Sequence, residues 1–203
     1  MKTLSIQDII TKVRTKYDEI GLNDSEMIGD TDSEHLDTII RSNIETAYRY
    51  VSFNADESMI EGKEVSGPLT IREDLVGTVS LPSDFLRCIS VRLSSWHSAG
   101  TLIDESSPEY RMQYDPFACG TYQNPVAALI HNNGRKLELF KAKTGSDTLV
   151  LVYVPTCGSE NIDVSDQLVE SFIYYVAGLT ATTFREDVAN DFFNIAKGLL
   201  GNE

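Results

Sequence analysis

Thr148-Leu149-Val150-Leu151-Val152-Tyr153-Val154 is apolar or β-branched at every position, and Pro155 ends the run. Such a run predicts a strand with both faces covered, at the centre of a small sheet. A polar turn follows, and then two amphipathic helices. We expect this helical pair to cover one face of the strand.

The C-terminal part, residues 163–200, has the pattern of two helices. Ser165 can cap the first helix, which should end near Arg185. Glu186 and Asp187 then suit the positive end of a second helix. Apolar residues recur at helical spacing in both: Leu168, Phe172, Tyr175, Val176 and Leu179 in the first, and Val188, Phe192, Ile195, Ala196 and Leu199 in the second.

The N-terminal part, residues 1–51, predicts a second helical pair. Ser5 and Asp8 have the spacing of an N-cap and its partner in the first turn, and Gly21 is a natural stop. The next helix should begin near Thr31 or Ser33. The apolar stripes of the two helices are Ile6, Ile9, Ile10, Val13, Tyr17 and Ile20, followed by Leu36, Ile39, Ile40, Ile44, Ala47 and Val51.

Residues 75–155 form a β-rich part. Within residues 77–86, a strand should run into a turn that contains Pro82. Residues 86–93 then alternate, with Ile89, Val91 and Leu93 on one face. Farther along, two short strands over 126–131 and 135–140 flank Asn132-Asn133-Gly134, which predicts a β-hairpin.

Two segments show little regular pattern. Residues 52–74 predict an extended loop with weak strand character over 69–71, and residues 94–125 predict an irregular segment rich in aromatic and polar residues. The order helix, helix, strands, helix, helix predicts the α+β class. We therefore expect one domain over residues 1–203, in which N- and C-terminal helical hairpins pack with a small, mainly antiparallel sheet and long irregular loops.

The chain is strongly acidic, with 31 acidic against 17 basic residues and a formal charge of −14. This balance weighs against sequence-specific binding of nucleic acid, which needs positive charge at the phosphates. No apolar run approaches the roughly 20 residues of a membrane span, and the first residues lack the apolar core of a signal peptide. The sequence therefore predicts a soluble protein made inside the cell, in which Cys88, Cys119 and Cys157 form no structural disulfide.

Motifs with a chemical mechanism are absent from the sequence: it has no Gly-rich phosphate loop, nucleophile elbow, Cys-x-x-Cys or paired histidines four residues apart. The acidic stretch 22–33 lacks the regular ligand spacing of a calcium loop. His35 is expected on the surface. We predict no catalytic, metal or cofactor-binding residue.

Several features occur in one order along nearly the whole chain. They are the N-terminal helical pair, Leu81-Pro82-Ser83-Asp84-Phe85-Leu86 before a strand that ends Val91-Arg92-Leu93, a hairpin, an apolar strand that ends Tyr153-Val154-Pro155, and a closing helical pair with Glu186 between its members and Ala196 and Leu199 near its end. In these features the sequence resembles the head-to-tail adaptor proteins (connector or gateway proteins) of short-tailed and related tailed bacteriophages.

The resemblance implies a structural protein of the virion neck or tail, made in the host cytoplasm. It would form a ring, commonly of twelve copies, beneath the capsid portal, with portal and tail or neck proteins as partners and no membrane. DNA would pass through the ring without sequence-specific binding. Some family members extend a C-terminal arm along the portal, whereas this sequence stops at Gly201-Asn202-Glu203, so 52–74 and 94–125 are the better candidates for that contact.

Acidic groups that face such a channel would repel DNA phosphates within a Debye length of roughly 8 Å. Head-to-tail packing in a ring requires two different complementary patches on each subunit. Exposed aromatic residues can supply one of them. The candidates lie in the irregular segment: Trp96, Tyr110, Tyr114, Phe117 and Tyr122.

Two alternatives stay open at this point. One is a small intracellular enzyme that uses Cys88, His97 or Cys119 together with a carboxylate, since folding can bring such residues together. The other is a different virion part, such as a neck or tail-completion protein.

Overall fold

The computed structural model describes residues 1–19, 30–131, 134–143, 147–183 and 186–201. The chain folds into two compact units. The helical unit is formed by Met1–Glu61 together with Thr156–Glu203, and the β unit is formed by Gly62–Pro155. The β unit is therefore an insertion between two segments that fold together, a division that the sequence pattern does not reveal.

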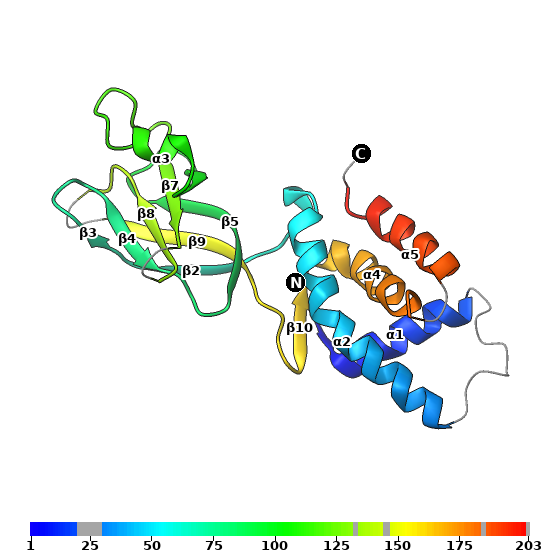
Figure 1. Cartoon of the computed structure of the whole chain (residues 1–203). Coiled ribbons are helices and arrows are strands. Elements are labelled where there is room, and N and C mark those ends of the chain that lie inside the picture. The colour runs from blue at the N-terminus through cyan, green and yellow to red at the C-terminus, as the bar shows by residue number, and fades with distance from the viewer. Residues whose placement is uncertain (20–29, 132–133, 144–146, 184–185, 202–203) are drawn as a thin grey trace. The chain divides into compact units, whose positions relative to one another are not determined.

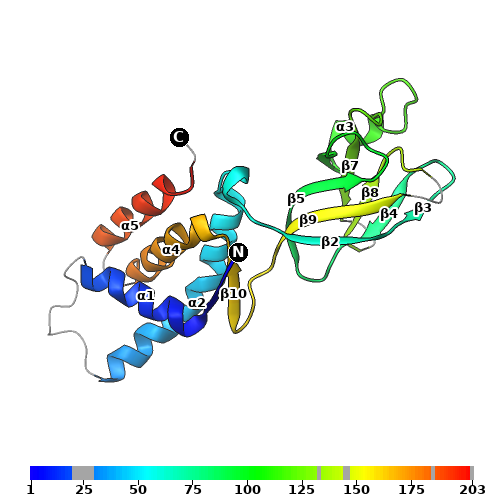
Figure 2. The same ribbon diagram turned by 180° about the vertical axis from the view of Figure 1, so that it is seen from behind.

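The helical unit contains long helices from both ends of the chain and one small sheet (Figures 1 and 2). In the sheet, β1 pairs antiparallel with β10, so that Lys2 lies opposite Val164. The elements are β1 (Lys2–Ser5), α1 (Ile6–Glu19), α2 (Asp30–Asn54), the 3₁₀ helix η1 (Glu57–Met59), β10 (Asn161–Val164), the 3₁₀ helix η2 (Asp166–Leu168), α4 (Val169–Ala181) and α5 (Glu186–Gly198).

The predicted cap at the start of α1 is confirmed. The hydroxyl of Ser5 accepts a hydrogen bond from the Asp8 backbone N–H at 3.1 Å, and the Asp8 carboxylate accepts one from the Ser5 backbone N–H at 3.2 Å. This reciprocal pair is a capping box, which satisfies N–H groups that the first turn leaves unpaired. The predicted stop at Gly21 and the acidic stretch as far as residue 29 lie outside the described residues, and residues 30–33 belong to α2.

Helix α4 contacts α1, α2 and α5, and its Phe172, Ile173 and Val176 are fully buried. A hydrogen bond joins the two segments of the unit, since the Tyr17 hydroxyl of α1 donates to the Ala177 carbonyl of α4 at 2.8 Å. The expectation that the C-terminal pair covers the apolar strand is therefore wrong, because the apolar faces of these helices pack within the helical unit, against the N-terminal pair.

The ends of the C-terminal helices differ from the prediction in detail. Ser165 precedes η2 without capping it, and its hydroxyl instead accepts a hydrogen bond from the Glu61 backbone N–H at 2.7 Å. Helix α4 ends at Ala181, before the expected end at Arg185. In α5, Ile195 and Leu199 are 41% and 39% exposed, so the real stripe consists of the buried Val188, Ala189, Phe192, Ala196 and, just beyond the helix, Leu200.

In its described residues, the β unit contains two sheets and one short helix (Figure 1). One sheet has the strand order β2-β9-β5, and the other has the order β3-β4-β8-β7-β6, in which only the β6–β7 pair is parallel among the described strands. The elements are β2 (Lys63–Pro68), β3 (Thr70–Ile71), β4 (Gly77–Ser80), β5 (Phe85–Leu93), β6 (Thr101–Asp104), α3 (Pro108–Met112), β7 (Val126–Ile130), β8 (Lys136–Leu139) and β9 (Thr148–Pro155).

The predicted α+β class and the mainly antiparallel sheets are confirmed. The apolar run forms β9, which lies between β2 and β5. Leu149, Leu151 and Tyr153 of β9 belong to one core with residues of both sheets, while Val150 and Val152 on the other face are half-buried. The predicted hairpin is also present, as β7 and β8 pair antiparallel. Asn132 and Asn133 at its turn lie outside the described residues.

The predicted loop over residues 52–74 is wrong for most of its length. Helix α2 continues to Asn54, η1 follows, and β2 is a strand, whereas β3 agrees with the strand character predicted over 69–71. In β2, Lys63 to Ser66 are exposed on both faces. Their sequence also shows no alternation of apolar and polar types. The pairing with β9, far along the chain, therefore makes this segment a strand. The irregular segment over 94–125 likewise contains β6 and α3.

Two irregularities in β5 change which of its side chains face the core. The pairing with β9 shifts between Phe85 and Arg87 and again between Cys88 and Ser90, so Ile89 is left without a position opposite β9. Each such bulge exchanges the two faces of a strand. Cys88 consequently packs on the core with Val91 and Leu93, and the predicted face that contained Ile89 is corrected. No helix in the described part of the chain combines the length and apolar content that crossing a bilayer requires.

A buried carboxylate holds the turn after β5. The two carboxylate oxygens of Asp147 accept hydrogen bonds from the backbone N–H groups of Lys143 and Ser95 at 2.5 and 3.0 Å, and from the hydroxyls of Ser94 and Ser95 at 3.1 and 2.8 Å. Burial raises the pKa of Asp147, but these hydrogen bonds outweigh burial and the pKa lies below its ordinary value of 3.8. The ionised carboxylate therefore stabilises the β unit.

We expect Asp147→Asn to be less stable than the wild type at about pH 7, with a difference that shrinks at about pH 3. The pKa is lower in the folded than in the unfolded state, so the contribution is present above about pH 4 and is lost as pH falls through the folded value. Urea unfolding at several pH values measures the difference. Asp166→Asn, at an exposed carboxylate, is the control variant. A difference for Asp147→Asn that is independent of pH would contradict the assignment.

Tyr17→Phe should lower the free energy of unfolding by about 1 kcal/mol, because it removes a buried hydrogen bond and keeps the ring. Denaturant unfolding followed by circular dichroism measures this. Tyr50→Phe is the matched control, as its ring stacks on Tyr175 with centroids 4.0 Å apart and this stack is retained. Equal stability of Tyr17→Phe and the wild type would show that the bond to Ala177 does not stabilise the unit.

Candidate functional site

The five aromatic residues predicted as a contact surface have different environments. Trp96 is only 2% exposed and belongs to the core of the β unit, which corrects its place in the predicted surface. Gly100 provides room for it, since a Cβ there would lie 2.6 Å from the Trp96 ring. Tyr122 is half-buried and packs on the same core, with the Lys143 ammonium 5.3 Å from its ring centroid.

The other three aromatic residues belong to α3 and the turn that follows it. Ser107 caps α3, since its hydroxyl accepts a hydrogen bond from the Tyr110 backbone N–H at 3.3 Å, and Pro108 occupies the first turn, where its missing N–H has no cost. Tyr110 and Tyr114, four residues apart, both contact the ring of Phe140 edge-on. The segment thus covers the face of the five-stranded sheet that points away from the shared core.

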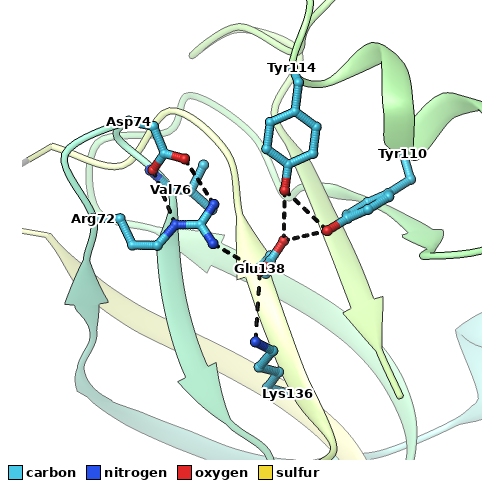
Figure 3. A network of polar contacts seen from close by, with 7 residues as sticks. All are labelled: Arg72, Asp74, Val76, Tyr110, Tyr114, Lys136 and Glu138. Atoms are coloured by element: carbon cyan, nitrogen blue, oxygen red, sulfur yellow. Dashed lines mark hydrogen bonds and ion pairs between the residues drawn. The ribbon is translucent and has the colours of Figure 1, made fainter. Parts of the chain in front are cut away.

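Glu138 on β8 lies beneath this cover and is 4% exposed (Figure 3). Its neighbours Leu137 and Leu139 point into the core, so Glu138 points to the opposite face. One carboxylate oxygen accepts hydrogen bonds from the hydroxyls of Tyr110 at 2.8 Å and Tyr114 at 3.2 Å. The other lies 3.4 Å from an Arg72 guanidinium nitrogen and 3.9 Å from Lys136 Nζ.

These contacts fix the chemical role of the cluster. Burial raises the pKa of Tyr110, and its hydrogen bonds with Tyr114 and Glu138 raise it further, so Tyr110 remains a donor at neutral pH. Arg72 is held in turn by Asp74 at 2.8 Å. Both carboxylate oxygens of Glu138 therefore have polar partners within the β unit. We interpret the cluster as an anchor that ties the segment after β6 to the sheet.

Beyond the anchor, three side chains project into solvent. Met112 is 50% exposed, Tyr114 is 51% exposed and Phe117 is 100% exposed. We call Met112, Tyr114 and Phe117 the tip. Large apolar side chains are usually buried, and a group of exposed ones marks a surface for interaction with another molecule. The tip is therefore the best candidate functional site of the β unit.

A second cluster joins two of the segments quoted for the resemblance. Asp84 accepts a hydrogen bond from the buried Tyr153 hydroxyl at 2.9 Å and lies 3.2 Å from Lys63 Nζ. Phe85 stacks on Tyr153 with ring centroids 5.7 Å apart and lies opposite Pro155 in the sheet. The segments that contain Leu81–Leu86 and Tyr153–Pro155 thus form one structural feature, located where the chain enters and leaves the β unit.

The residues of the enzyme alternative have ordinary surroundings. Cys88 lies opposite Tyr153 in the sheet, the His97 backbone N–H donates to the Tyr122 carbonyl at 2.9 Å, and the Cys119 thiol donates to the Pro116 carbonyl at 3.6 Å. Burial raises the pKa of the Cys157 thiol to about 11, so it stays protonated and unreactive at neutral pH. In the described ranges, no group of three or more His, Cys, Asp or Glu side chains is arranged to hold a metal ion.

Charge is divided unequally between the two units. The helical unit contains 21 acidic and 8 basic residues, a formal charge of −13, whereas the β unit contains 10 acidic and 9 basic residues, a formal charge of −1. Nearly all of the net charge of −14 therefore belongs to the helical unit. This division follows only once the structure has defined the units.

No protein-family model matches the chain, and a search of curated proteins finds no match either.

Sequence reasoning named Tyr110, Tyr114 and Phe117 but missed Glu138 and Met112. A glutamate between two leucines of a strand indicates a solvent-facing position, because strands alternate. In the sequence, the burial of Glu138 is indicated only by Tyr110 and Tyr114, which place two hydroxyls on one side of the segment after β6.

Glu138→Ala should free the segment that carries the tip. We expect a loss of about 2 kcal/mol in the free energy of unfolding, because two hydrogen bonds to a charged acceptor disappear. Amide hydrogen exchange over residues 107–119 should become faster. Glu109→Ala, at an exposed carboxylate on α3, is the control and should change neither quantity. Unchanged exchange in Glu138→Ala would show that the anchor is not needed.

Proposed function

We propose that this chain is a structural, non-enzymatic protein of a tailed-bacteriophage particle that forms a ring between the capsid portal and the tail, around the path of the DNA. The resemblance over nearly the whole chain supports this proposal. The observation that carries it furthest is the division of charge between the helical unit and the β unit.

A conduit must not hold the duplex that passes through it. A unit with a formal charge of −13, repeated around a ring, repels phosphates within a Debye length of roughly 8 Å at physiological salt. The β unit, at −1, imposes no comparable repulsion on a neighbouring protein. We therefore expect the helical unit to face the DNA and the β unit to provide contacts with protein.

The ring also requires two different surfaces on each copy, because a closed ring is built head to tail. Exposed apolar side chains occur in both units. The tip belongs to the β unit, while Ile195 and Leu199, on one face of α5, belong to the helical unit. Each copy therefore has at least two separate apolar surfaces.

Electron microscopy of the purified protein, alone and mixed with the portal protein of the same virus, tests the proposal. We expect rings, either free or docked on the portal. A protein that stays monomeric and does not bind the portal would contradict the proposal. If the chain is instead a different neck or tail-completion protein, density in intact particles will place it away from the portal.

Salt should promote assembly, because neighbouring helical units repel one another. We expect the fraction in rings to rise between about 0.01 M and about 0.15 M salt, as the Debye length falls from roughly 30 Å to roughly 8 Å. Changing four exposed acids of the helical unit to amides (Glu34, Glu57, Glu160 and Asp191) should shift assembly to lower salt.

The control changes four acids of the β unit to glutamine: the exposed Glu64, Glu73 and Glu109 and the half-buried Glu105. This variant should keep the salt dependence of the wild type. Light scattering or analytical ultracentrifugation measures the fraction assembled. An equal shift in both variants would show that the charge of the helical unit has no special part in assembly.

A further inference from the structure

Residues 106–120, which contain α3 and the tip, cover part of the five-stranded sheet without contributing a buried residue to it. Residues 101–124 all lie in the described ranges, and none of them is buried. Tyr110, which packs on the sheet, is only half-buried. We call residues 106–120 the strap. A segment with few buried apolar contacts opens at a smaller free-energy cost than the core on which it lies.

The face of the sheet beneath the strap is apolar. A buried cluster lies there, separate from the core that the two sheets share: Val76, Ala128, Ile130 and Phe140. Tyr110 of the strap packs against this cluster. Ala128 lies opposite the buried Glu138 in the pairing of β7 with β8. The strap therefore hides an apolar surface although it buries little of its own side-chain area.

The strap has internal hydrogen bonds of its own. The Asp115 carboxylate accepts a hydrogen bond from the Phe117 backbone N–H at 2.9 Å, and the Asp115 carbonyl accepts one from the Cys119 backbone N–H at 2.9 Å. The Gln113 side-chain oxygen accepts one from the Gly120 backbone N–H at 2.8 Å. Both partners of each bond belong to the strap, so the bonds persist when the strap separates from the sheet.

Two tyrosines fasten the strap to the sheet (Figure 3). Its first residues bond to Asp104 in the turn after β6, and the other hydrogen bonds from the strap to described residues outside it involve the hydroxyls of Tyr110 and Tyr114. Both donate to one carboxylate oxygen of Glu138, and both rings contact Phe140. Hydrogen bonds weaken steeply with distance and angle, so both are lost once the strap moves.

We propose that the strap opens as one unit from the five-stranded sheet while the rest of the β unit stays folded. In the closed form Glu138 holds the strap, and in the open form Ala128, Ile130 and Phe140 become accessible to solvent. Because Phe117 belongs to the strap, opening moves the tip and uncovers a second apolar surface of the β unit at the same time. The inference goes beyond the proposed function and does not depend on it.

Two adjacent alanines allow the opening to be measured. Ala127 and Ala128 are both 0% exposed, but Ala127 belongs to the shared core and Ala128 to the cluster beneath the strap. Ala127→Cys and Ala128→Cys, each in the full chain, are treated with N-ethylmaleimide, and mass spectrometry separates the label on the new thiol from that on the native cysteines. We expect the thiol at position 128 to react at least about 100-fold faster, because it requires only the local opening.

Urea separates local opening from global unfolding. The urea dependence of each reaction scales with the surface that its opening exposes. Below the unfolding transition, the reaction at position 128 should change little with urea, whereas the reaction at position 127 should accelerate steeply. Equal rates at the two positions, or an equal dependence on urea, would overturn the inference, because both thiols would then react only through global unfolding. Neither result bears on ring formation, so the proposed function stands or falls separately.

Substitutions at and away from the Glu138 contact test what holds the strap closed. Combined with Ala128→Cys, Tyr114→Phe should speed the reaction at position 128 about tenfold, because it removes a hydrogen bond to a charged acceptor and keeps the ring. Asp147→Asn is the control, since the hydrogen bonds of Asp147 remain in the open form. It should speed the reaction at position 127 only. An equal effect of Asp147→Asn at both positions, or no effect of Tyr114→Phe, would contradict the proposal.

Native-state proteolysis tests the wild-type chain, in which no substitution can disturb folding. Arg111 is exposed in α3, and trypsin cleaves after it only when the chain around it opens. We expect this cleavage well below the urea concentration of global unfolding, with the same weak urea dependence as the reaction at position 128. Cleavage at Arg111 that occurs only through global unfolding would overturn the inference, even if a cysteine variant failed to fold.

Discussion

The pairing of β2 with β9 is the constraint on which the rest of the structure depends. Lys63, at the start of β2, lies opposite Tyr153, near the end of β9, so the chain enters and leaves the β unit at the same place. Asp84 fastens this place through Lys63 and the Tyr153 hydroxyl. Because the chain enters and leaves the β unit at the same place, residues 1–61 and 156–203 can meet and form one helical unit.

Local patterns in the sequence predict the elements whose stabilising interactions are themselves local. The capping box of Ser5 and Asp8 and the β7–β8 hairpin depend on neighbours in the chain, and the structure contains both. The start of α5 at Glu186 follows from the same kind of signal. Capping residues and alternation report on structure over a few residues, and this is the range over which the sequence is informative here.

Features that depend on distant partners were not predictable. Strand β2 has no alternation, and only its pairing with β9 makes it a strand. The bulge in β5 exchanges Ile89 for Cys88 on the core face, although the sequence alternates regularly through both. In the candidate site, Phe117 is fully exposed, whereas the burial of Trp96 and Glu138 depends on strands and turns elsewhere in the β unit.

The buried Glu138 shows how a polar core group can serve a surface. A carboxylate among apolar side chains is costly unless every oxygen has a partner, and replacing such a cluster by apolar residues often costs no stability. Apolar packing alone does not fix the orientation of the segment that it buries. Tyr110 and Tyr114 must bring their hydroxyls to one oxygen of Glu138, and this requirement sets the rotation of α3 and the path of the chain toward Phe117. The same tyrosine that satisfies the buried charge is half-exposed at the tip, so the geometry of the core is transmitted to the surface through one side chain.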